Sequence, residues 1–146
     1  MIYRRLKDTE DNEISKIISA YKHPEVLRYI SIDENNYWSY VTESENVYFY
    51  KVFNDNDLVA TIHLELCDRI LFMDVVVFPE YQRKGVATEV IKDIQAEYFG
   101  LDFDKITVSI DESNIPSIKL FEKSGFICVG KDEELLKYEY INPTLG

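Results

Sequence analysis

The stretch ILFMDVVVFPEYQRKGVATEVIKDI, from Ile70 to Ile94, decides the fold. It begins with an apolar run whose single charge is Asp74, passes through a polar turn around Gly85, and ends in a helical pattern. A strand that leads through a short turn into a helix leaves backbone N–H groups at the helix start without partners. Such groups bind phosphates, so the stretch predicts an anion site at residues 83–88.

Length and charge limit the class of protein. The 146 residues fit one domain, and we expect a single domain over residues 1–146. Acidic residues outnumber basic ones by 27 to 16, which gives a formal net charge of -11. This balance argues against a nucleic-acid partner, because binding phosphates needs a basic surface. It favours a cationic substrate, although charge spread over the surface for solubility gives the same composition.

The cysteines and the apolar segments indicate the compartment. Cys67 and Cys128 lie far apart and match no metal spacing, so we expect reduced thiols and no metal site. No apolar segment approaches the roughly 20 residues of a membrane helix. The start, MIYRRLKD, lacks the apolar region of a signal peptide. The sequence therefore predicts a cytoplasmic protein without membrane association.

The N-terminal part of the chain predicts one strand followed by helices. Ile2–Leu6 has strand character, and Thr9 or Asp11 can cap a helix that follows. The apolar face of that helix, at helical spacing, consists of Ile14, Ile17, Ile18 and Tyr21. Pro24 interrupts the pattern, and residues 26–30 predict a further helical turn that includes Val26, Leu27 and Ile30.

A short helix is predicted around three apolar residues, Tyr37, Trp38 and Val41. Two interpretations of its aromatic side chains remain open. They line a pocket for an acceptor molecule, or they are ordinary core and rim residues of a helical flap.

A hairpin is predicted next. Val47–Phe53 is rich in β-branched and aromatic residues, 54–57 is a turn signal, and Leu58–Leu66 alternates. Its second strand has an apolar face and a more polar one, and the latter consists of Val59, Thr61, His63 and Glu65. Ile70–Phe78 predicts a central strand that is covered on both faces. Asp74 in such a strand needs a partner or faces a polar cleft.

The chain after the central strand predicts a parallel crossover. The turn leads into a helix with one apolar face, formed by Ala87, Val90, Ile91, Ile94 and Tyr98. Gly100 is the predicted left-handed cap of that helix, and Lys105–Ile110 is the next strand. A strand, helix and strand of these lengths make a right-handed crossover between parallel neighbours.

A second helix and a final hairpin complete the chain. Ser113 or Asn114 caps the helix, Pro116 lies in its first turn, and Gly125 ends it. The hairpin pairs Phe126–Gly130 with Leu135–Ile141. These elements predict an α+β fold with a mixed sheet.

Two blocks of sequence resemble the GNAT superfamily of acetyl-CoA-dependent N-acetyltransferases. The family signature Gln/Arg-x-x-Gly-x-Gly/Ala is matched by Gln82-Arg83-Lys84-Gly85-Val86-Ala87 after a strand. A second block, Asn114-x-x-Ser117-x-x-Leu120-Phe121-Glu122-Lys123-x-Gly125-Phe126, follows at a distance that fits one helix and one strand. The resemblance implies the GNAT fold, in which a central, mostly antiparallel sheet contains one parallel strand pair and is accompanied by about four helices.

The resemblance also implies acetyl-CoA as cofactor and a set of residues that bind it. The pyrophosphate would lie against the turn, where Gly85 lacks a Cβ and Arg83 and Lys84 add positive charge. Backbone groups of Val75–Val77 and Ile106–Ile110 would splay apart and hold the pantetheine arm, with the N–H of Val77 as an oxyanion donor. The implied cofactor-binding residues are Val75, Val77, Gln82, Arg83, Lys84, Gly85, Val86, Ala87, Thr88, Asn114, Ser117 and Phe121.

The implied reaction is direct attack of an amine on the thioester. Presenting a lysine-like amine in its neutral form at pH 7 costs roughly 4 to 5 kcal/mol, so a base is useful. Asp74 is the first candidate for the base or amine contact, because some family members carry an acidic residue at this strand position. Glu65 and His63 are further candidates, since adjacent antiparallel strands place all three around one cleft.

Phe121 departs from the family pattern, because many members have Tyr there as proton donor to the leaving thiolate. Unassisted loss of the thiolate at pH 7 costs only about 2 kcal/mol, so an acid is helpful without being indispensable. Ser117, Tyr138, Tyr140 or solvent are the possible substitutes.

Three functions remain in competition at this point. The first is acetyl transfer to the primary amine of a small cationic molecule or a basic peptide or protein, by a monomer or a homodimer. The second is a non-catalytic acyl-CoA-binding sensor or interaction module, for which Phe121 is the motivation. In the third, the Gly85 turn binds another nucleotide.

Overall fold

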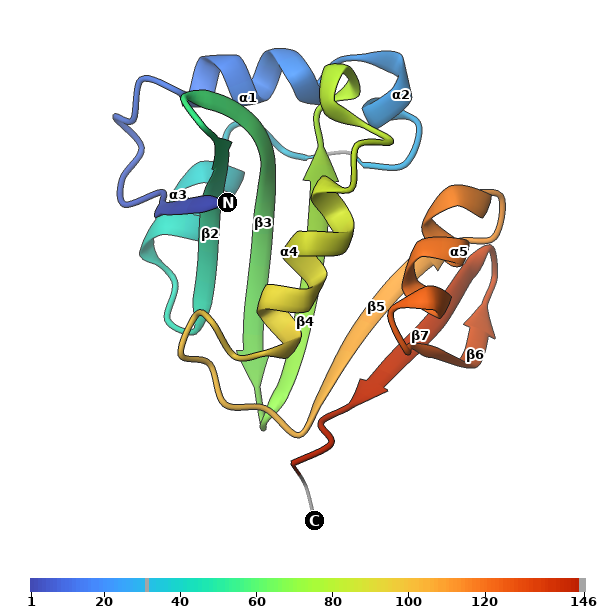
Figure 1. Ribbon diagram of the computed structural model, residues 1–146. Coiled ribbons are helices and arrows are strands. Elements are labelled where there is room, and N and C mark those ends of the chain that lie inside the picture. The colour runs from blue at the N-terminus through green and yellow to red at the C-terminus, as the bar shows by residue number, and fades with distance from the viewer. Residues whose placement is uncertain (31, 145–146) are drawn as a thin grey trace. The chain divides into compact units, whose positions relative to one another are not determined.

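The structure is a computed structural model, which describes residues 1–30 and 32–144 (Figure 1). These residues form a mixed α/β fold with five α-helices and a seven-stranded sheet of order β1-β2-β3-β4-β5-β7-β6. The chain divides into two compact units. The first unit contains residues 1–65 and 74–87, and the second contains 66–73 and the chain from Thr88 onward.

The first unit contains three antiparallel strands. They are β1 (Ile2–Arg5), β2 (Val47–Asn54) and β3 (Asp57–Cys67), and β2 pairs with both neighbours. The predicted hairpin is confirmed, and its turn contains Asp55 at φ 55°. Because Phe49 pairs with His63 in this register, the two side chains share one face of the sheet.

Three helices of the first unit precede the hairpin. They are α1 (Ile14–Tyr21), α2 (Pro24–Leu27) and α3 (Tyr37–Glu43). The predicted caps of α1 are wrong: Glu13 is the N-cap residue, and Asp11 accepts a hydrogen bond from the Glu13 N–H just before the helix. Pro24 begins α2 rather than only interrupting α1, since proline fits the first turn of a helix.

The helices pack on the strands through aromatic and aliphatic side chains. Figure 1 shows α3 beside β2, where the rings of Trp38 and Phe49 meet edge to face at 5.5 Å. Ile14, Ile17 and Tyr21 of α1 are buried, as predicted. The predicted helical turn is confirmed for Val26 and Leu27, which lie in α2; Val26 is buried and Leu27 is exposed.

An ion-pair cluster fixes the loop before α1 to β2. The ammonium of Lys51 lies 2.6 Å from Asp11 and 2.8 Å from Glu13. Lys51 is only 7% exposed, so its charge needs both carboxylates.

Strand β4 (Ile70–Val77) is not covered on both faces as predicted. Leu71, Met73 and Val76 are buried, but Phe72 and Asp74 are exposed. One face of the strand is therefore open to solvent at Asp74, which removes the need for a buried partner. A 3-10 turn, η1 (Pro79–Tyr81), follows β4.

The second unit contains the parallel pair. Ile70–Phe72 of β4 pair in parallel with 105–107 of β5 (Lys105–Asp111), which confirms the predicted crossover. Ile106 and Thr107 belong to this ladder, so the expectation of an unpaired backbone is wrong for these two residues. For 108–110 it remains a prediction.

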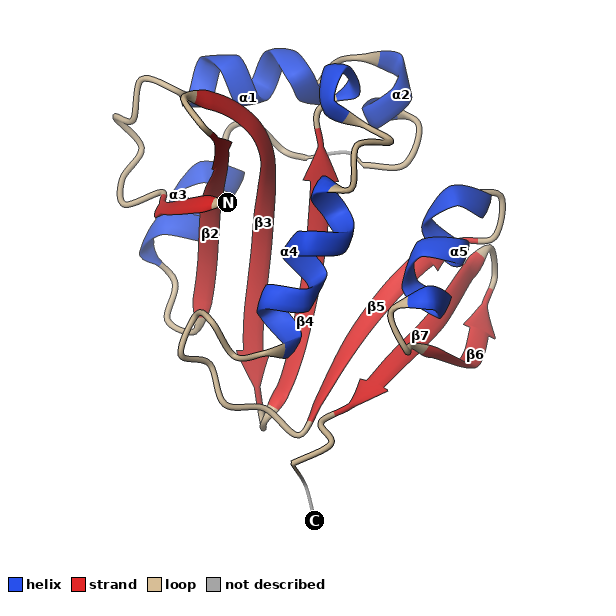
Figure 2. Ribbon diagram, viewed as in Figure 1, coloured by secondary structure: helices blue, strands red, loops and turns tan. Residues whose placement is uncertain are grey.

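The final hairpin consists of β6 (Ile127–Asp132) and β7 (Leu135–Ile141), as predicted. Strand β7 also pairs antiparallel with β5 along its whole length. Helix α5 (Ile115–Lys123) begins at the predicted cap Asn114, and Figure 2 shows it beside β7. The hydroxyl of Tyr138 in β7 donates to Glu122 of this helix over 2.9 Å.

Helix α4 (Val86–Gln95) ends differently from the prediction. Glu97 has φ 60°, its N–H bonds the Ile94 carbonyl, and the Tyr98 N–H bonds the Asp93 carbonyl, which is the Schellman pattern. The predicted cap Gly100 lies three residues beyond, and Tyr98 is 63% exposed instead of buried. The early end of the helix turns Tyr98 away from its apolar face.

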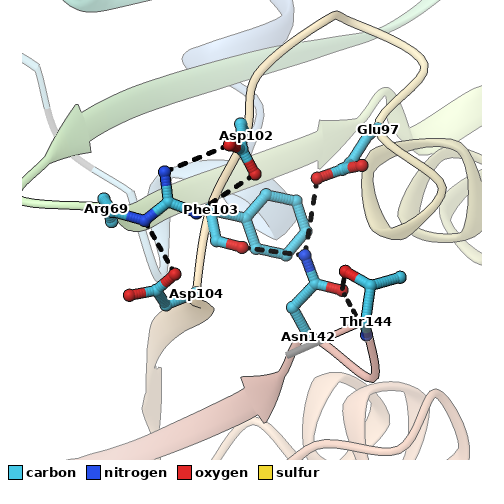
Figure 3. A network of polar contacts seen from close by, with 7 residues as sticks. All are labelled: Arg69, Glu97, Asp102, Phe103, Asp104, Asn142 and Thr144. Carbon is cyan, nitrogen blue, oxygen red and sulfur yellow. Dashed lines mark hydrogen bonds and ion pairs between the residues drawn. The ribbon is translucent and has the colours of Figure 1, made fainter. Parts of the chain in front are cut away.

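Two polar clusters fix the connection that leads into β5 (Figure 3). In the first, the guanidinium of Arg69 bonds both carboxylate oxygens of Asp102 and one oxygen of Asp104. These carboxylates raise the pKa of Arg69, and Arg69 in turn lowers the pKa of Asp102. The β3–β4 turn is thereby held to the segment that precedes β5.

In the second cluster, the buried amide of Asn142 donates to the carbonyl of Phe103 over 2.8 Å, as Figure 3 shows. Its oxygen accepts from the backbone N–H and the hydroxyl of Thr144. The chain after β7 is thus anchored to the segment before β5. Among the described residues, no helix is long and apolar enough to cross a membrane.

Candidate active site

The polar face of β3 carries a hydrogen-bonded chain of side chains in the first unit. Nδ1 of His63 lies 2.6 Å from the hydroxyl of Tyr37 in α3, and Nε2 lies 2.8 Å from Oε1 of Glu65. Glu65 stands two residues along the same strand, so the alternation of β3 brings both side chains to one face. The Tyr37 ring also packs on the rings of Trp38, Phe49 and His63.

Glu65 has a second donor. The hydroxyl of Tyr40, three residues after Tyr37 in α3, donates to the same Oε1 over 2.7 Å. This bond is the principal cause that raises the pKa of Tyr40. Glu65 is therefore held from both α3 and β3 while its side chain stays 35% exposed.

Asp74 belongs to the same electrostatic environment. Its pKa is raised, first by desolvation; His63 opposes the rise and the charge of Glu65 adds to it. The carboxylate reaches solvent, yet the protein atoms around it remove enough water to disfavour its charge. The structure thus brings together His63, Glu65 and Asp74, the three residues that the sequence suggested for one site.

Tyr21 and Thr61 extend this group. The hydroxyl of Tyr21 in α1 lies 2.6 Å from that of Thr61 on the polar face of β3. Burial raises the pKa of Tyr21, and the charge of Asp74 raises it further. Burial likewise raises the pKa of Tyr37, with Tyr21, Asp74 and Glu65 adding to the effect. Both phenols are consequently protonated at neutral pH.

Sequence reasoning missed the parts that Tyr21 and Tyr40 take. Tyr21 was assigned to the core by its helical spacing, and its ring is buried there while its hydroxyl reaches Thr61. Of the aromatics left open between pocket and core, Trp38 is core and Tyr37 joins the polar chain. The one feature of the sequence that indicates such a role is the hydroxyl that Tyr21 carries on the otherwise apolar face of α1.

The turn from Gln82 to Thr88 contains two left-handed residues. Arg83 has φ 63° and Gly85 has φ 82°, and α4 begins at Val86 directly after them. A Cβ on Gly85 would meet no heavy atom within 4 Å. The backbone angle by itself favours glycine here, and close approach of a phosphate stays a prediction.

The side chains of the turn are mostly exposed. Gln82 donates to the carbonyl of Val77 over 3.1 Å, and Lys84 lies over the ring of Tyr81 at 5.8 Å. Val86, the first residue of α4, is buried, and the N–H groups of a first helical turn have no partner within the helix. Two cations, a helix start and open space fit the pyrophosphate of coenzyme A chemically.

The second block lies on α5. The Asn114 side chain accepts from the Ser117 N–H over 3.4 Å and caps the helix, and Ser117 itself is half-buried. Phe121 is 8% exposed and packs edge to face on Phe126 at 5.1 Å. These contacts give Asn114 and Phe121 structural roles that stand beside the predicted cofactor contacts.

The suggested substitutes for a proton donor have other contacts. The hydroxyl of Tyr138 donates a hydrogen bond to Glu122, and the centroids of the Tyr140 and Phe126 rings lie 5.5 Å apart. Burial raises the pKa of Tyr138, and the bond to Glu122 adds to the rise. Within residues 1–30 and 32–144, no group of three or more histidine, cysteine, aspartate or glutamate side chains could hold a metal ion.

Comparisons with known proteins agree on one family. The model of the Acetyltransferase (GNAT) family matches residues 10–126. A relative in Bacillus subtilis strain 168, the SPbeta prophage-derived uncharacterized N-acetyltransferase YokL, is 29% identical over 136 residues, which cover 88% of this chain and 73% of the relative.

Solved structures share the fold at low sequence identity. A domain from Methanocaldococcus jannaschii DSM 2661 has a TM-score of 0.80 and 18% identity, and the match covers 96% of this chain and 97% of that one. A chimera of the spermidine N-acetyltransferase SpeG from Vibrio cholerae and hSSAT has a TM-score of 0.78 and 20% identity, with 99% and 98% covered.

Proposed function

Because the chain belongs to the acetyltransferase (GNAT) family, we propose that it transfers an acetyl group from acetyl-CoA to a primary amine of a small cationic molecule or a basic peptide. The observation that carries the proposal is the position of Asp74. Its carboxylate is partly desolvated, open to solvent, and shares its surroundings with His63 and Glu65. The family match includes residues of both units, so we treat them as one catalytic domain.

Acetyl-CoA, when bound, supplies an activated thioester. We assign its pyrophosphate to the turn, with Arg83, Lys84 and the N–H groups from Gly85 to Thr88 as donors. The left-handed Gly85 directly precedes α4, so the segment with the two cations leads into the unpaired N–H groups of the first helical turn. Val75 and Val77 of β4 are the backbone contacts for the pantetheine arm, and the N–H of Val77 is the oxyanion donor.

Asp74 acts as the base for the acceptor in this proposal. Neutralising a lysine-like ammonium at pH 7 costs roughly 4 to 5 kcal/mol, whereas an α-amine costs about 1 kcal/mol. Desolvation raises the pKa of Asp74, which makes its carboxylate a stronger proton acceptor than an ordinary aspartate. The acceptor's positive charge is the natural partner for Asp74 and Glu65, which repel one another.

No side chain is assigned as the acid. Phe121 cannot donate a proton, and the hydroxyl of Tyr138 already serves Glu122. With a thiol pKa of about 8.5, release of the thiolate at pH 7 costs only about 2 kcal/mol. Solvent is sufficient to protonate it afterwards.

Turnover of a panel of amines tests the function. Purified protein is incubated with acetyl-CoA and polyamines, amino acids, aminoglycosides or basic peptides, and free thiol is followed. Spermidine belongs in the panel because a structural neighbour of the same fold is called a spermidine N-acetyltransferase. We expect thiol release with at least one cationic amine and none without an amine. Coenzyme A binding with no turnover on any amine would contradict the proposal.

The alternative is a non-catalytic acyl-CoA-binding sensor, which Phe121 favours because it removes the usual acid. The pH dependence of thiol release separates the two functions. An enzyme without an acid releases thiol faster as the pH rises, because more amine is neutral. A sensor binds acetyl-CoA and leaves the thioester intact at every pH.

A further inference from the structure

The hydrogen bonds around His63 fix the position of its proton. An ionised carboxylate only accepts hydrogen bonds, so the 2.8 Å contact between Nε2 and Glu65 Oε1 requires a proton on Nε2. In a neutral imidazole Nδ1 is then an acceptor, and the hydroxyl of Tyr37 at 2.6 Å must donate to it. The protonated state of Tyr37, whose pKa is raised by burial, agrees with this direction.

We propose that Tyr37 is a positioning residue: by donating to Nδ1 of His63 it holds the imidazole with its Nε2–H on Glu65, which keeps Glu65 in place to receive a positive charge of the acceptor amine. The inference rests on the proposed function for its substrate. Its structural part, the hydrogen bond from Tyr37 to Nδ1, stands independently of any reaction.

Glu65 is held at one oxygen and open at the other. Oε1 receives the proton of His63 Nε2 and the proton of the Tyr40 hydroxyl. No bond to Oε2 is found among residues 1–30 and 32–144, and about a third of the side chain is exposed. Two donors on one oxygen hold the Glu65 side chain in one orientation. Binding a cation would therefore cost less side-chain entropy than it would at a mobile carboxylate.

The charges around Glu65 lack a cation. The groups around it are Asp74 from β4, His63 from β3, and Tyr37 and Tyr40 from α3. In the described chain, no lysine or arginine lies within ion-pair distance of Glu65 or Asp74. By contrast, Asp11 and Glu13 of the same unit share Lys51. An incoming ammonium would give Glu65 and Asp74 the positive partner that Lys51 gives Asp11 and Glu13.

Tyr37→Phe tests the positioning role. The substitution keeps the ring contacts with Trp38 and Phe49 and removes only the proton donor. We expect ¹⁵N NMR of His63 above pH 8 to show the Nε2–H form in both proteins, because Glu65 requires it, and a downfield shift of the Nδ1 resonance in the variant, where Nδ1 has lost its donor. The KM for a cationic acceptor should rise about fivefold to tenfold, the value of one hydrogen bond, with the KM for acetyl-CoA unchanged.

Tyr48→Phe is the matched control. It removes the same hydroxyl from β2, but Tyr48 pairs with Leu64 and so lies on the opposite face from His63 and Glu65. This variant should keep both the Nδ1 resonance of His63 and the acceptor KM of the wild type. An unchanged Nδ1 resonance in Tyr37→Phe would overturn the proposal, whether or not an acceptor has been found.

His63→Ala separates positioning from packing. It removes the ring through which Tyr37 reaches Glu65, so Tyr37→Phe in this background should change the acceptor KM by less than about twofold. The full loss in both backgrounds would mean that Tyr37 acts by packing alone, and would contradict the inference. If no amine reacts, the proposed function fails, while the NMR result still decides whether Tyr37 holds His63.

Discussion

The side-chain amide of Gln82 donates to the carbonyl of Val77 over 3.1 Å. This bond joins the end of β4 to the first residue of the turn that leads into α4. One interaction therefore connects the proposed thioester contact at Val77 with the proposed pyrophosphate site in the turn. Gln82 is exposed, and the bond has little to contribute to overall stability.

Gln82→Leu should therefore weaken cofactor binding more than stability. We expect the Kd for coenzyme A to rise roughly twofold to tenfold, as for one lost hydrogen bond, with an unchanged melting temperature. Calorimetric titration and thermal unfolding measure the two quantities. Loss of stability without a change in Kd would show that the bond serves the fold only.

Gly85→Glu should abolish binding of coenzyme A. The new carboxylate would repel the pyrophosphate, and a side chain at φ 82° is strained. Gly100→Ala is the control, since Gly100 also has a positive φ of 73° with open space around it but follows the opposite end of α4. The control should lose stability and keep the Kd for coenzyme A. Unchanged affinity in Gly85→Glu would refute the proposed pyrophosphate site.

Asp74→Asn should lower kcat/KM for an acceptor on the order of 100-fold or more, the range of a general base. The loss should be largest below the pKa of the acceptor amine, where the proton must be removed, and should shrink above it. Asp132→Asn removes the same charge from exposed β6 and should leave the rate unchanged. Parallel pH–rate profiles of Asp74→Asn and wild type would remove Asp74 from the mechanism.

The same Asp74→Asn variant should be more heat-stable than the wild type at pH 7. The folded-state pKa of Asp74 is raised above its ordinary value of 3.8, so the ionised carboxylate disfavours the folded state. The penalty is absent below the unfolded pKa and present once the pH exceeds the folded one. The gain in melting temperature should thus vanish as the pH falls below about 3.8. A variant less stable at pH 7 would show that the Asp74 charge is compensated.

Patterns along the sequence predicted the strands and the order of elements because burial imposes a period on them. The polar face of β3 followed from alternation alone, and it led to His63 and Glu65 as partners of Asp74. The parallel crossover followed from the length of the segment between Ile70 and Lys105.

Long-range contacts could not be predicted in the same way. The pairing of β7 with β5 depends on which strand reaches the free edge, and nothing local at Tyr138 encodes it. The end of α4 was misplaced because Glu97, a residue with a Cβ, takes the left-handed position for which glycine is the usual signal. Tyr40 escaped notice since its partner Glu65 lies 25 residues away.

Asn142→Ala should destabilise the fold by about 1–3 kcal/mol, because it leaves the buried Phe103 carbonyl without its donor. Urea unfolding measures this loss. Arg69→Ala, which removes an exposed ion-pair partner from the neighbouring cluster, should change stability much less. Equal losses in both variants would mean that the surface cluster, rather than Asn142, anchors the segment before β5.

The destination of the acetyl group tests the central claim most directly. Acetyl-CoA labelled in its acetyl carbon is incubated with wild-type protein and the amine that gives the fastest thiol release, and the products are analysed by mass spectrometry and NMR. We predict that the label appears on the amine nitrogen, and that Gly85→Glu produces none of this product. Label recovered only as unreacted acetyl-CoA or free acetate would contradict acetyl transfer to an amine.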